Sequence, residues 1–170
     1  QTAAFCIGGD VPPYTTATNT YNTALGFQTG EQVTTGDKNT FVGGLTGDAI
    51  TTGARNTALG YAALGTDDLG SKSVAIGYGA LNSQNYSTAT DSQNTAVGYD
   101  AGALLTTAIA NTFIGWSAGL NVSTGNVNTF VGASCGVGDS SAPLTGANNT
   151  GVGQGSLQNL EGSGNANTAV

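Results

Sequence analysis

The chain of 170 residues carries three basic and ten acidic residues, which gives a formal net charge of -7 at pH 7. Nucleic-acid binding draws its affinity from clustered lysine and arginine, so this balance argues against a nucleic-acid partner. The chain also has no histidine and no run of about 18 apolar residues, which argues against histidine-based catalysis and a membrane-spanning helix. We therefore expect neither an enzyme nor a cofactor site.

A five-residue motif, Asn-Thr-(Ala/Phe)-(Leu/Val/Ile)-Gly, recurs along nearly the whole chain. A degenerate copy spans residues 4–8, and a variant with serine and valine in place of asparagine and threonine begins at Ser73. The other copies begin at residues 22, 39, 56, 94, 111, 128 and 149, and residues 167–170 start one more. The motif glycines keep a 17-residue spacing, with a 21-residue spacing only from Gly77 to Gly98 and from Gly132 to Gly153. Repetition at a nearly fixed period indicates stacked units that bury a core only against their neighbours.

We predict an all-β parallel β-solenoid of about ten coils, forming one domain over residues 1–170. Positions 1–21 are expected to form a degenerate first coil, and positions 22–170 the regular 17-residue and 21-residue coils. A hexapeptide solenoid would need an aliphatic residue six positions after the motif aliphatic, but Glu31 and Asp48 occupy two of these positions. A weaker column of β-branched residues predicts a second short strand in the coil, and hence a two-layered β-roll. This column covers residues 33–36, 50–53, 105–108, 122–125 and 144–146.

Side chains alternate between the two faces of a strand, so the motif divides into two sets. Threonine and the branched aliphatic residue share one face, while asparagine, alanine or phenylalanine, and glycine share the other. We expect the aliphatic column to line the solenoid interior. Its members are Leu25, Val42, Leu59, Ile76, Val97, Ile114, Val131 and Val152. The opposite face, with Phe41, Phe113 and Phe130, then needs a partner outside the coil, which predicts self-association.

Three further expectations follow from the repeat. The motif glycines should occupy turns where a Cβ atom would clash, and the asparagines should form a ladder of amide groups between coils. Cys6 and Cys135 lie about seven coils apart, roughly 30 Å at the spacing of β-strands. That separation rules out an intrachain disulfide, which needs Cα atoms within about 7 Å. Two unpaired, partly buried cysteines are expected, with an interchain bridge as the alternative.

The two 21-residue intervals place their extra residues after the same strand of the coil. Insertions in a solenoid become loops, often on the binding face. We expect both loops to emerge on one side. Either they are tolerated surface decoration, because solenoids accept insertions at little cost, or they form a candidate sugar-binding site. Its residues are Asn82, Gln84, Asn85, Tyr86, Asp139, Ser140 and Ser141.

Two columns of side chains recur at equivalent coil positions. Lys38, Arg55 and Lys72 precede the motif and are expected to form a solvated edge, beside a neighbouring acidic pair at Glu31 and Asp48. A patch that binds a receptor or an anionic glycan is the alternative. Aromatic residues follow the motif glycines and should cap the core or an interface, with sugar stacking as the alternative. This aromatic column consists of Phe27, Tyr61, Tyr78, Tyr99 and Trp116.

The adjacent carboxylates of Asp67 and Asp68 are interpreted as part of a solvated turn. Calcium binding there is the alternative, although one turn offers few ligands and the calcium-binding glycine-aspartate repeat is absent. Paired threonines such as Thr34 and Thr35 raise the possibility of ice binding. Adjacent strand residues point to opposite faces, so only one of each pair could reach a flat outer surface.

The segments 73–77 and 94–102 resemble known fibre repeats. Ser73-Val74-Ala75-Ile76-Gly77 is similar to the repeat of trimeric autotransporter adhesin heads of the YadA-like type. Asn94-Thr95-Ala96-Val97-Gly98-Tyr99, with Ala101-Gly102, resembles the longer repeats of bacteriophage tail-fibre and bacterial surface-fibre proteins. The resemblance implies a left-handed β-roll that trimerises about its long axis in an extracellular fibre, on a cell surface or a virion.

These observations give a hypothesis of function. We expect a non-enzymatic structural or adhesive segment of an extracellular fibre, in contact with copies of itself and with host glycan or envelope protein. A subunit that polymerises head to tail into a filament is the alternative, and an ice- or glycan-binding module is a minor one.

Overall fold

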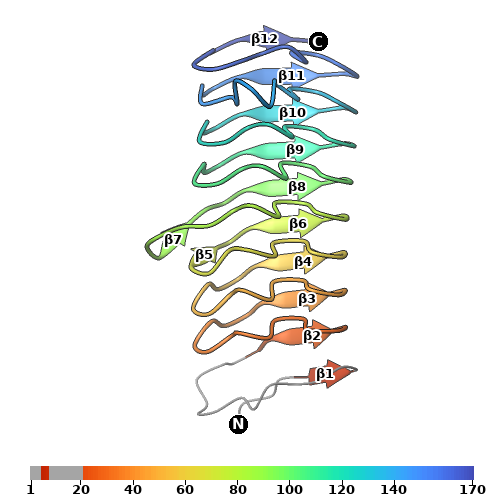
Figure 1. Cartoon of the computed structure of the whole chain (residues 1–170), viewed down its shortest axis with the longest axis vertical. Helices are drawn as coiled ribbons and strands as arrows, with labels where there is room; N and C mark the ends of the chain where they lie inside the picture. Colours follow the sequence, from red (N-terminus) through yellow and green to blue (C-terminus); the bar gives the residue numbers. More distant parts are fainter. Residues whose placement is uncertain (1–4, 8–20) are drawn as a thin grey trace.

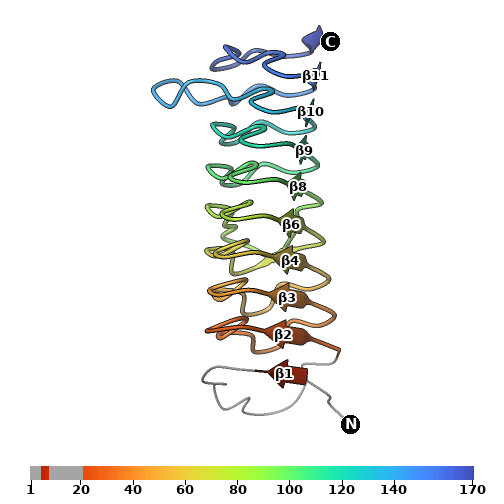
Figure 2. The same ribbon diagram turned by 90° about the vertical axis from the view of Figure 1, so that its right-hand side faces the viewer.

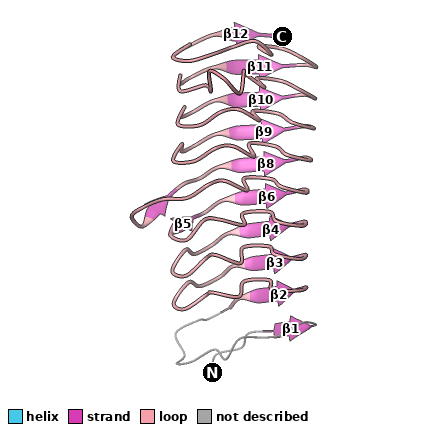
Figure 3. Ribbon diagram, in the orientation of Figure 1, coloured by secondary structure: helices cyan, strands magenta, loops and turns pink. Residues whose placement is uncertain are grey.

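The computed structural model describes residues 5–7 and 21–170, and within these ranges the chain is all-β without a helix (Figure 3). Ten strands form one parallel sheet, stacked one above another along the long axis (Figure 1). Each strand pairs in register with the motif of the neighbouring coil. The strands are β1 (Phe5–Ile7), β2 (Thr23–Leu25), β3 (Thr40–Val42), β4 (Thr57–Leu59), β6 (Val74–Ile76), β8 (Thr95–Val97), β9 (Thr112–Ile114), β10 (Thr129–Val131), β11 (Thr150–Val152) and β12 (Thr168–Ala169). The predicted parallel β-solenoid, with a 17-residue coil as its basic unit, is confirmed.

From β2 to β11 a glycine follows each three-residue strand, because the chain turns there against the next coil. Gly77 has a φ of 131°, and a Cβ atom built on it would lie 2.3 Å from the carbonyl oxygen of Gly98. Gly98 stands in the same relation to Gly115, at 2.3 Å. The coils stack so closely at this corner that a side chain would force them apart, as the sequence predicts.

The motif alanines and phenylalanines point into the coil, which is the reverse of the predicted orientation. Phe41 is 1% exposed, and Phe113 and Phe130 are 0% exposed. Ala58, Ala75 and Ala96 are also fully buried in the same core cluster. The prediction that Phe41, Phe113 and Phe130 form an oligomer face is therefore wrong, and the aliphatic column faces outward instead.

Size complementarity within the stack explains why this face can be buried. The residue six positions after the motif alanine or phenylalanine has a left-handed backbone in every regular coil that reaches this position. Where the strand carries Phe113, this residue is glycine, and a Cβ atom on Gly119 would lie 2.6 Å from the ring. Where the strand carries Ala58 or Ala75, the residue is a buried leucine, at Leu64 or Leu81.

Where these two positions carry alanine and glycine, a phenylalanine ring of the next coil occupies the space inside the coil. Ala96 is followed by Gly102, and a Cβ atom on Gly102 would lie 2.7 Å from the ring of Phe113 on the next strand. Ala24 and Gly30 stand in the same relation to Phe41, at 3.1 Å. Large side chains are therefore distributed along the axis so that each coil is filled by its own residue or by its neighbour's.

The motif asparagines form the predicted ladder inside the stack. The side-chain carbonyl of Asn39 accepts a hydrogen bond from the backbone N–H of Asn56 at 2.9 Å, and its Nδ2 donates to the carbonyl of Gly53 at 2.9 Å. Asn56 repeats both bonds with the backbone of Ser73 and Gly70. The buried amides therefore connect each coil to the next, and they satisfy backbone groups that the turns leave unpaired.

The second layer consists mainly of turns, so the prediction of a second strand in the coil is wrong for most coils. Two short strands, β5 (Gly70–Ser71) and β7 (Thr90–Asp91), pair with each other in parallel. Elsewhere in the described part, Val122 and Leu144 form a single bridge of the same kind. The β-branched residues at these positions supply buried side chains, such as Ile50 and Val122, rather than extended strands.

Candidate functional site

The outward face of the ten-stranded sheet carries two parallel rows of side chains, which we call the sheet face. One row consists of the motif aliphatic residues, among which Leu59 is 49% and Leu25 is 42% exposed. The other row consists of the second motif residue in each coil. These residues are Thr23, Thr40, Thr57, Val74, Thr95, Thr112, Thr129, Thr150 and Thr168. In-register pairing keeps both rows straight, and Figure 2 shows the strands aligned along one side of the stack.

The threonine hydroxyl groups of the sheet face make no hydrogen bond within the described part of the chain, whereas buried hydroxyls do. For example, the hydroxyl of Ser92 donates to the carbonyl of Ser71 at 2.6 Å. A large outward surface of methyl, methylene and unpaired hydroxyl groups is unusual for a lone chain, because contiguous exposed apolar patches usually mark an interaction site. The sequence analysis missed this face, because alternation alone does not say which apolar set is inside.

The predicted aromatic column is present, and it lies at the edge of the sheet where the strands end. The rings of Tyr61 and Tyr78 stack with centroids 5.5 Å apart, and those of Tyr78 and Tyr99 with centroids 5.1 Å apart. All three tyrosines are 50% exposed. Phe27 and Trp116 occupy other rungs of the column and are also exposed, and Gly44 interrupts it between Phe27 and Tyr61. The column therefore faces solvent in this chain instead of capping its core.

The basic residues lie at the opposite edge, where the strands begin. Lys38 forms an ion pair with Asp37, and Lys72 with Asp91. The hydrogen bond from Lys38 lowers the pKa of Asp37. Lys38 and Arg55 are exposed and Lys72 is half-buried, so the prediction of a charged, solvated edge is confirmed. Such exposed pairs contribute little to stability.

The acidic pair at the turn side is less open than the sequence suggests. Asp48 is half-buried, and its Oδ1 atom has no hydrogen-bond partner. Burial raises the pKa of this carboxyl, and the nearby charge of Glu31 raises it further. On the next coil Gly65 leaves the space that a side chain would fill, because a Cβ there would lie 3.5 Å from that oxygen.

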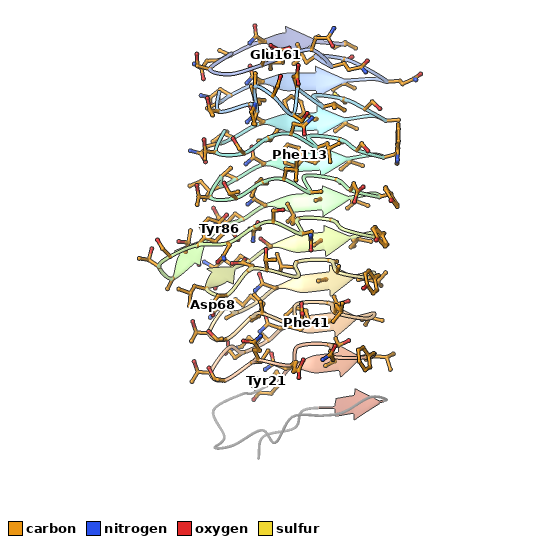
Figure 4. The ribbon with its side chains drawn as sticks, in the orientation of Figure 1. Tyr21, Phe41, Asp68, Tyr86, Phe113 and Glu161 are labelled. Atoms are coloured by element: carbon orange, nitrogen blue, oxygen red, sulfur yellow. The ribbon has the colours of Figure 1, made fainter. Side chains whose placement is uncertain are left out.

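The first insertion is anchored in the interior by two of its four predicted binding residues. Gln84 is fully buried, and its Nε2 donates to Oδ2 of Asp67 at 2.6 Å and to the Ser73 hydroxyl at 3.0 Å. Tyr86 is also buried; its hydroxyl donates to the carbonyl of Ala108 at 2.6 Å and accepts from Asn94 Nδ2 at 3.1 Å. Figure 4 shows Tyr86 on the side of the stack where the strands begin. These two side chains are therefore closed to a ligand, whereas Asn82 is half-buried and Asn85 is exposed.

The expectation of a solvated turn at Asp67 and Asp68 is wrong. Asp67 is fully buried, and its Oδ1 accepts a hydrogen bond from the backbone N–H of Gly70 at 3.0 Å. Burial raises the pKa of this carboxyl, although the bond from Gln84 acts in the opposite direction. Asp68 is half-buried and bonds to the hydroxyl of Thr51. The two carboxyls therefore belong to the interior and to a coil-to-coil contact.

The second insertion remains open to solvent. Asp139, Ser140 and Ser141 are exposed, and Oδ1 of Asp139 accepts bonds from the N–H and hydroxyl groups of Ser141, both at 2.8 Å. The bonds from Ser141 lower the pKa of Asp139. This loop projects away from the sheet (Figure 2), while the segment before β7 projects beside the strand starts (Figure 1). The two insertions therefore do not form one site on one side.

The structure describes the surroundings of one of the two cysteines. Cys135 is buried and unpaired, and burial raises the pKa of its thiol. The surroundings of the Cys6 side chain lie outside the described residues. Within residues 5–7 and 21–170, no three acidic or cysteine side chains gather as metal ligands would.

Comparisons with known proteins add no family to this picture. No protein-family model matches the chain, and neither the curated proteins nor the solved structures include a match. In the described ranges no helix reaches the length and hydrophobicity needed to cross a bilayer.

Proposed function

We propose that this chain is a non-enzymatic structural segment of an extracellular fibre that self-associates through the sheet face. The supporting observation is the pair of rows on the outside of a straight stack, one of aliphatic residues and one of threonines with Val74 among them. Burying aliphatic side chains such as Leu59 and Ile114 against a second copy would remove apolar surface from water, at about 25 cal/mol per Å². A homotrimer packed about its long axis would cover the sheet face of every copy.

The rigidity of the stack supports a shaft that sets reach. Backbone hydrogen bonds join each coil to the next on the strand and on the turns, as in the bonds from Gly77 to Leu59 and from Leu81 to Ala101. Each coil adds about 4.8 Å of length. The asparagine ladder joins most of the successive coils along the stack. Such a segment can act as a rigid rod that sets the reach of a fibre.

Sedimentation velocity of the wild-type chain and of face variants tests this proposal. Leu59→Asp and Val97→Asp place a charge on the sheet face, and we expect each to shift the chain from an oligomer to a monomer. Leu104→Asp is the matched control, because Leu104 is an exposed leucine outside the sheet face. A monomeric wild-type chain at micromolar concentration would contradict self-association. A broad series of sizes that survives both face variants would favour head-to-tail polymers.

An ordered water lattice such as ice is a second candidate occupant of the sheet face. In the described chain the threonine hydroxyls are unpaired, and on either side of Val74 they repeat at the strand spacing of about 4.8 Å, beside the aliphatic row. This array differs from the paired threonines singled out in the sequence, of which Thr34 and Thr35 are both exposed on a turn. If this candidate holds, the wild-type chain is monomeric and shows thermal hysteresis, which Thr112→Lys abolishes.

Contact with a host glycan is the adhesive part of the proposal. The exposed loop at Asp139–Ser141 and the aromatic column are the surfaces able to hydrogen-bond to a sugar or stack on it. Deleting residues 139–142 returns this coil to the 17-residue length. Binding to immobilised glycans should fall in this variant while the sedimentation coefficient changes little, and unchanged binding would exclude the loop.

A further inference from the structure

The three stacked tyrosines form a surface feature that self-association through the sheet face does not use. Tyr61, Tyr78 and Tyr99 follow the corner glycines of successive coils, so their rings repeat at nearly the same place. Their planes differ by 18° in the lower pair and 8° in the upper pair. Their hydroxyl groups make no hydrogen bond within the described chain, and half of each side chain is exposed.

We infer that this ladder is a site of oxidative coupling, at which phenol rings of neighbouring coils are joined covalently. An exposed phenol is accessible to an oxidant that removes one electron and one proton. The resulting radical couples only to a second phenol that it can reach. The centroid separations of 5.1 and 5.5 Å bring the rings within reach after a rotation about the side-chain bonds. Solvent on the outer side of each ring leaves room for that rotation.

The chemical step is the coupling of two tyrosines by hydrogen peroxide with a peroxidase. Each phenol gives up one electron and one proton, and the two radicals form a carbon–carbon bond between their ortho positions. The hydrogen on each bonded ring carbon then moves to oxygen, which restores both aromatic rings. Hydrogen peroxide accepts the two electrons and two protons and becomes two molecules of water. The product is a dityrosine that bridges adjacent coils and reinforces the stack along its axis.

Other tyrosines in the described chain serve as internal comparisons. Tyr86 is buried and its hydroxyl is bonded to the interior, so the oxidant cannot reach it. Tyr21 is more exposed than the ladder tyrosines, but its ring lies beside a cation instead of a second phenol: Lys38 Nζ lies 5.9 Å from its ring centroid. Coupling should therefore depend on the pairing of rings and not on exposure alone.

Trypsin cleavage provides a direct readout, because Lys72 separates Tyr61 from Tyr78. An equal mixture of ¹⁵N-labelled and unlabelled full-length chain is treated with peroxidase and hydrogen peroxide, unfolded and digested. We expect peptide 56–72 joined to peptide 73–170, with both halves carrying the same label, together with dityrosine fluorescence. Tyr78→Phe should abolish this product, because Tyr61 and Tyr99 lie two coils apart, while Tyr21→Phe should leave its yield unchanged.

Three results would overturn the inference. They are the absence of dityrosine from the wild-type chain, an equal yield of the joined peptides in Tyr78→Phe, and joined peptides of mixed label as the main product. The last result would place the coupling between chains, where the ladder geometry within one chain has no part.

Discussion

The ring of Phe41 occupies the space that a side chain at position 47 would need, because a Cβ atom on Gly47 would lie 2.8 Å from the ring. The same ring also closes on Gly30 of the preceding coil, where a Cβ atom would lie 3.1 Å away. A strand phenylalanine thus requires glycine on both sides along the axis. The coils of Ala58 and Ala75 meet the same spatial demand with a leucine.

This relationship predicts that the two packing solutions can be exchanged. Ala58→Phe alone overfills its coil and should cost about 1–3 kcal/mol, and Leu64→Gly alone should cost about 2–5 kcal/mol for the lost leucine. The double variant should be close to wild type, because position 47 on the preceding coil is already glycine. Replacing Leu64 also removes a left-handed leucine, with a φ of 54°. Urea unfolding of the double-mutant cycle measures the coupling.

A mismatched pair supplies the control for this exchange. Ala58→Phe combined with Leu81→Gly places the new space one coil away from the new ring. Its two costs should add, since no side chain fills the vacated volume. Equal stability of the matched and mismatched doubles would contradict the packing argument.

Neighbouring residues of one strand should respond oppositely to a charge. Ala96 is fully buried, so Ala96→Asp places an unpaired carboxylate in the core and should unfold the middle of the stack. Val97 belongs to the sheet face, so Val97→Asp should leave the circular dichroism spectrum and melting temperature of the monomer nearly unchanged. Equal damage by both variants would contradict the orientation of the strand.

The asparagine ladder should be sensitive to removal of a single amide. Asn56→Ala leaves the N–H of Ser73 and the carbonyl of Gly70 without partners. Each orphaned buried group costs about 1–3 kcal/mol. Urea unfolding measures the loss, and hydrogen exchange should quicken first at the amide of Ser73. Asn159→Ala is the control; Asn159 is exposed, and we expect a change within about 0.5 kcal/mol.

Asp67 should make the chain more stable in acid than at neutral pH. Its folded pKa is raised by burial above the ordinary value of 3.8, so the folded state holds the proton more tightly than the unfolded state. The resulting stability is fully present below pH 3.8 and is lost as the pH rises through the folded pKa. Asp67→Asn should flatten this part of the profile of unfolding free energy against pH.

Asp139→Asn serves as the comparison for the pH profile. The pKa of Asp139 is lowered and its side chain is exposed, so any effect lies on the acid side and has the opposite sign. If the decline in stability above pH 3.8 is as steep in Asp67→Asn as in the wild type, Asp67 does not cause it.

The repeat made the parallel stack, the corner glycines and the amide ladder predictable, because each depends on a spacing that the sequence states directly. The orientation of the strand was not predictable from Thr57-Ala58-Leu59 alone, since both faces of this segment contain an apolar side chain. The deciding signal lies six residues further on, where glycine accompanies Phe41 and leucine accompanies Ala58. That association is visible in the sequence, but its meaning depends on knowing that the two positions face each other.

Which residues of the insertions are buried could not be predicted from their composition. Gln84 and Asn85 are polar neighbours in a stretch that looks like a loop, yet one is buried and the other exposed. Gln84 is buried because Asp67 lies at the equivalent position of the preceding coil and accepts its hydrogen bond. Composition does not reveal this pairing, whereas alignment of the coils places the two residues in one column.

Each strand of the main sheet pairs only with the strands directly before and after it, so the molecule is a one-dimensional array of equivalent cells. Its free energy of unfolding should grow in proportion to the number of coils, and unfolding should proceed as a zipper from an end. The buried bond between Gln84 and Asp67 is one of the contacts between neighbouring cells. Breaking it should weaken the coupling between the coils before it and the coils after it.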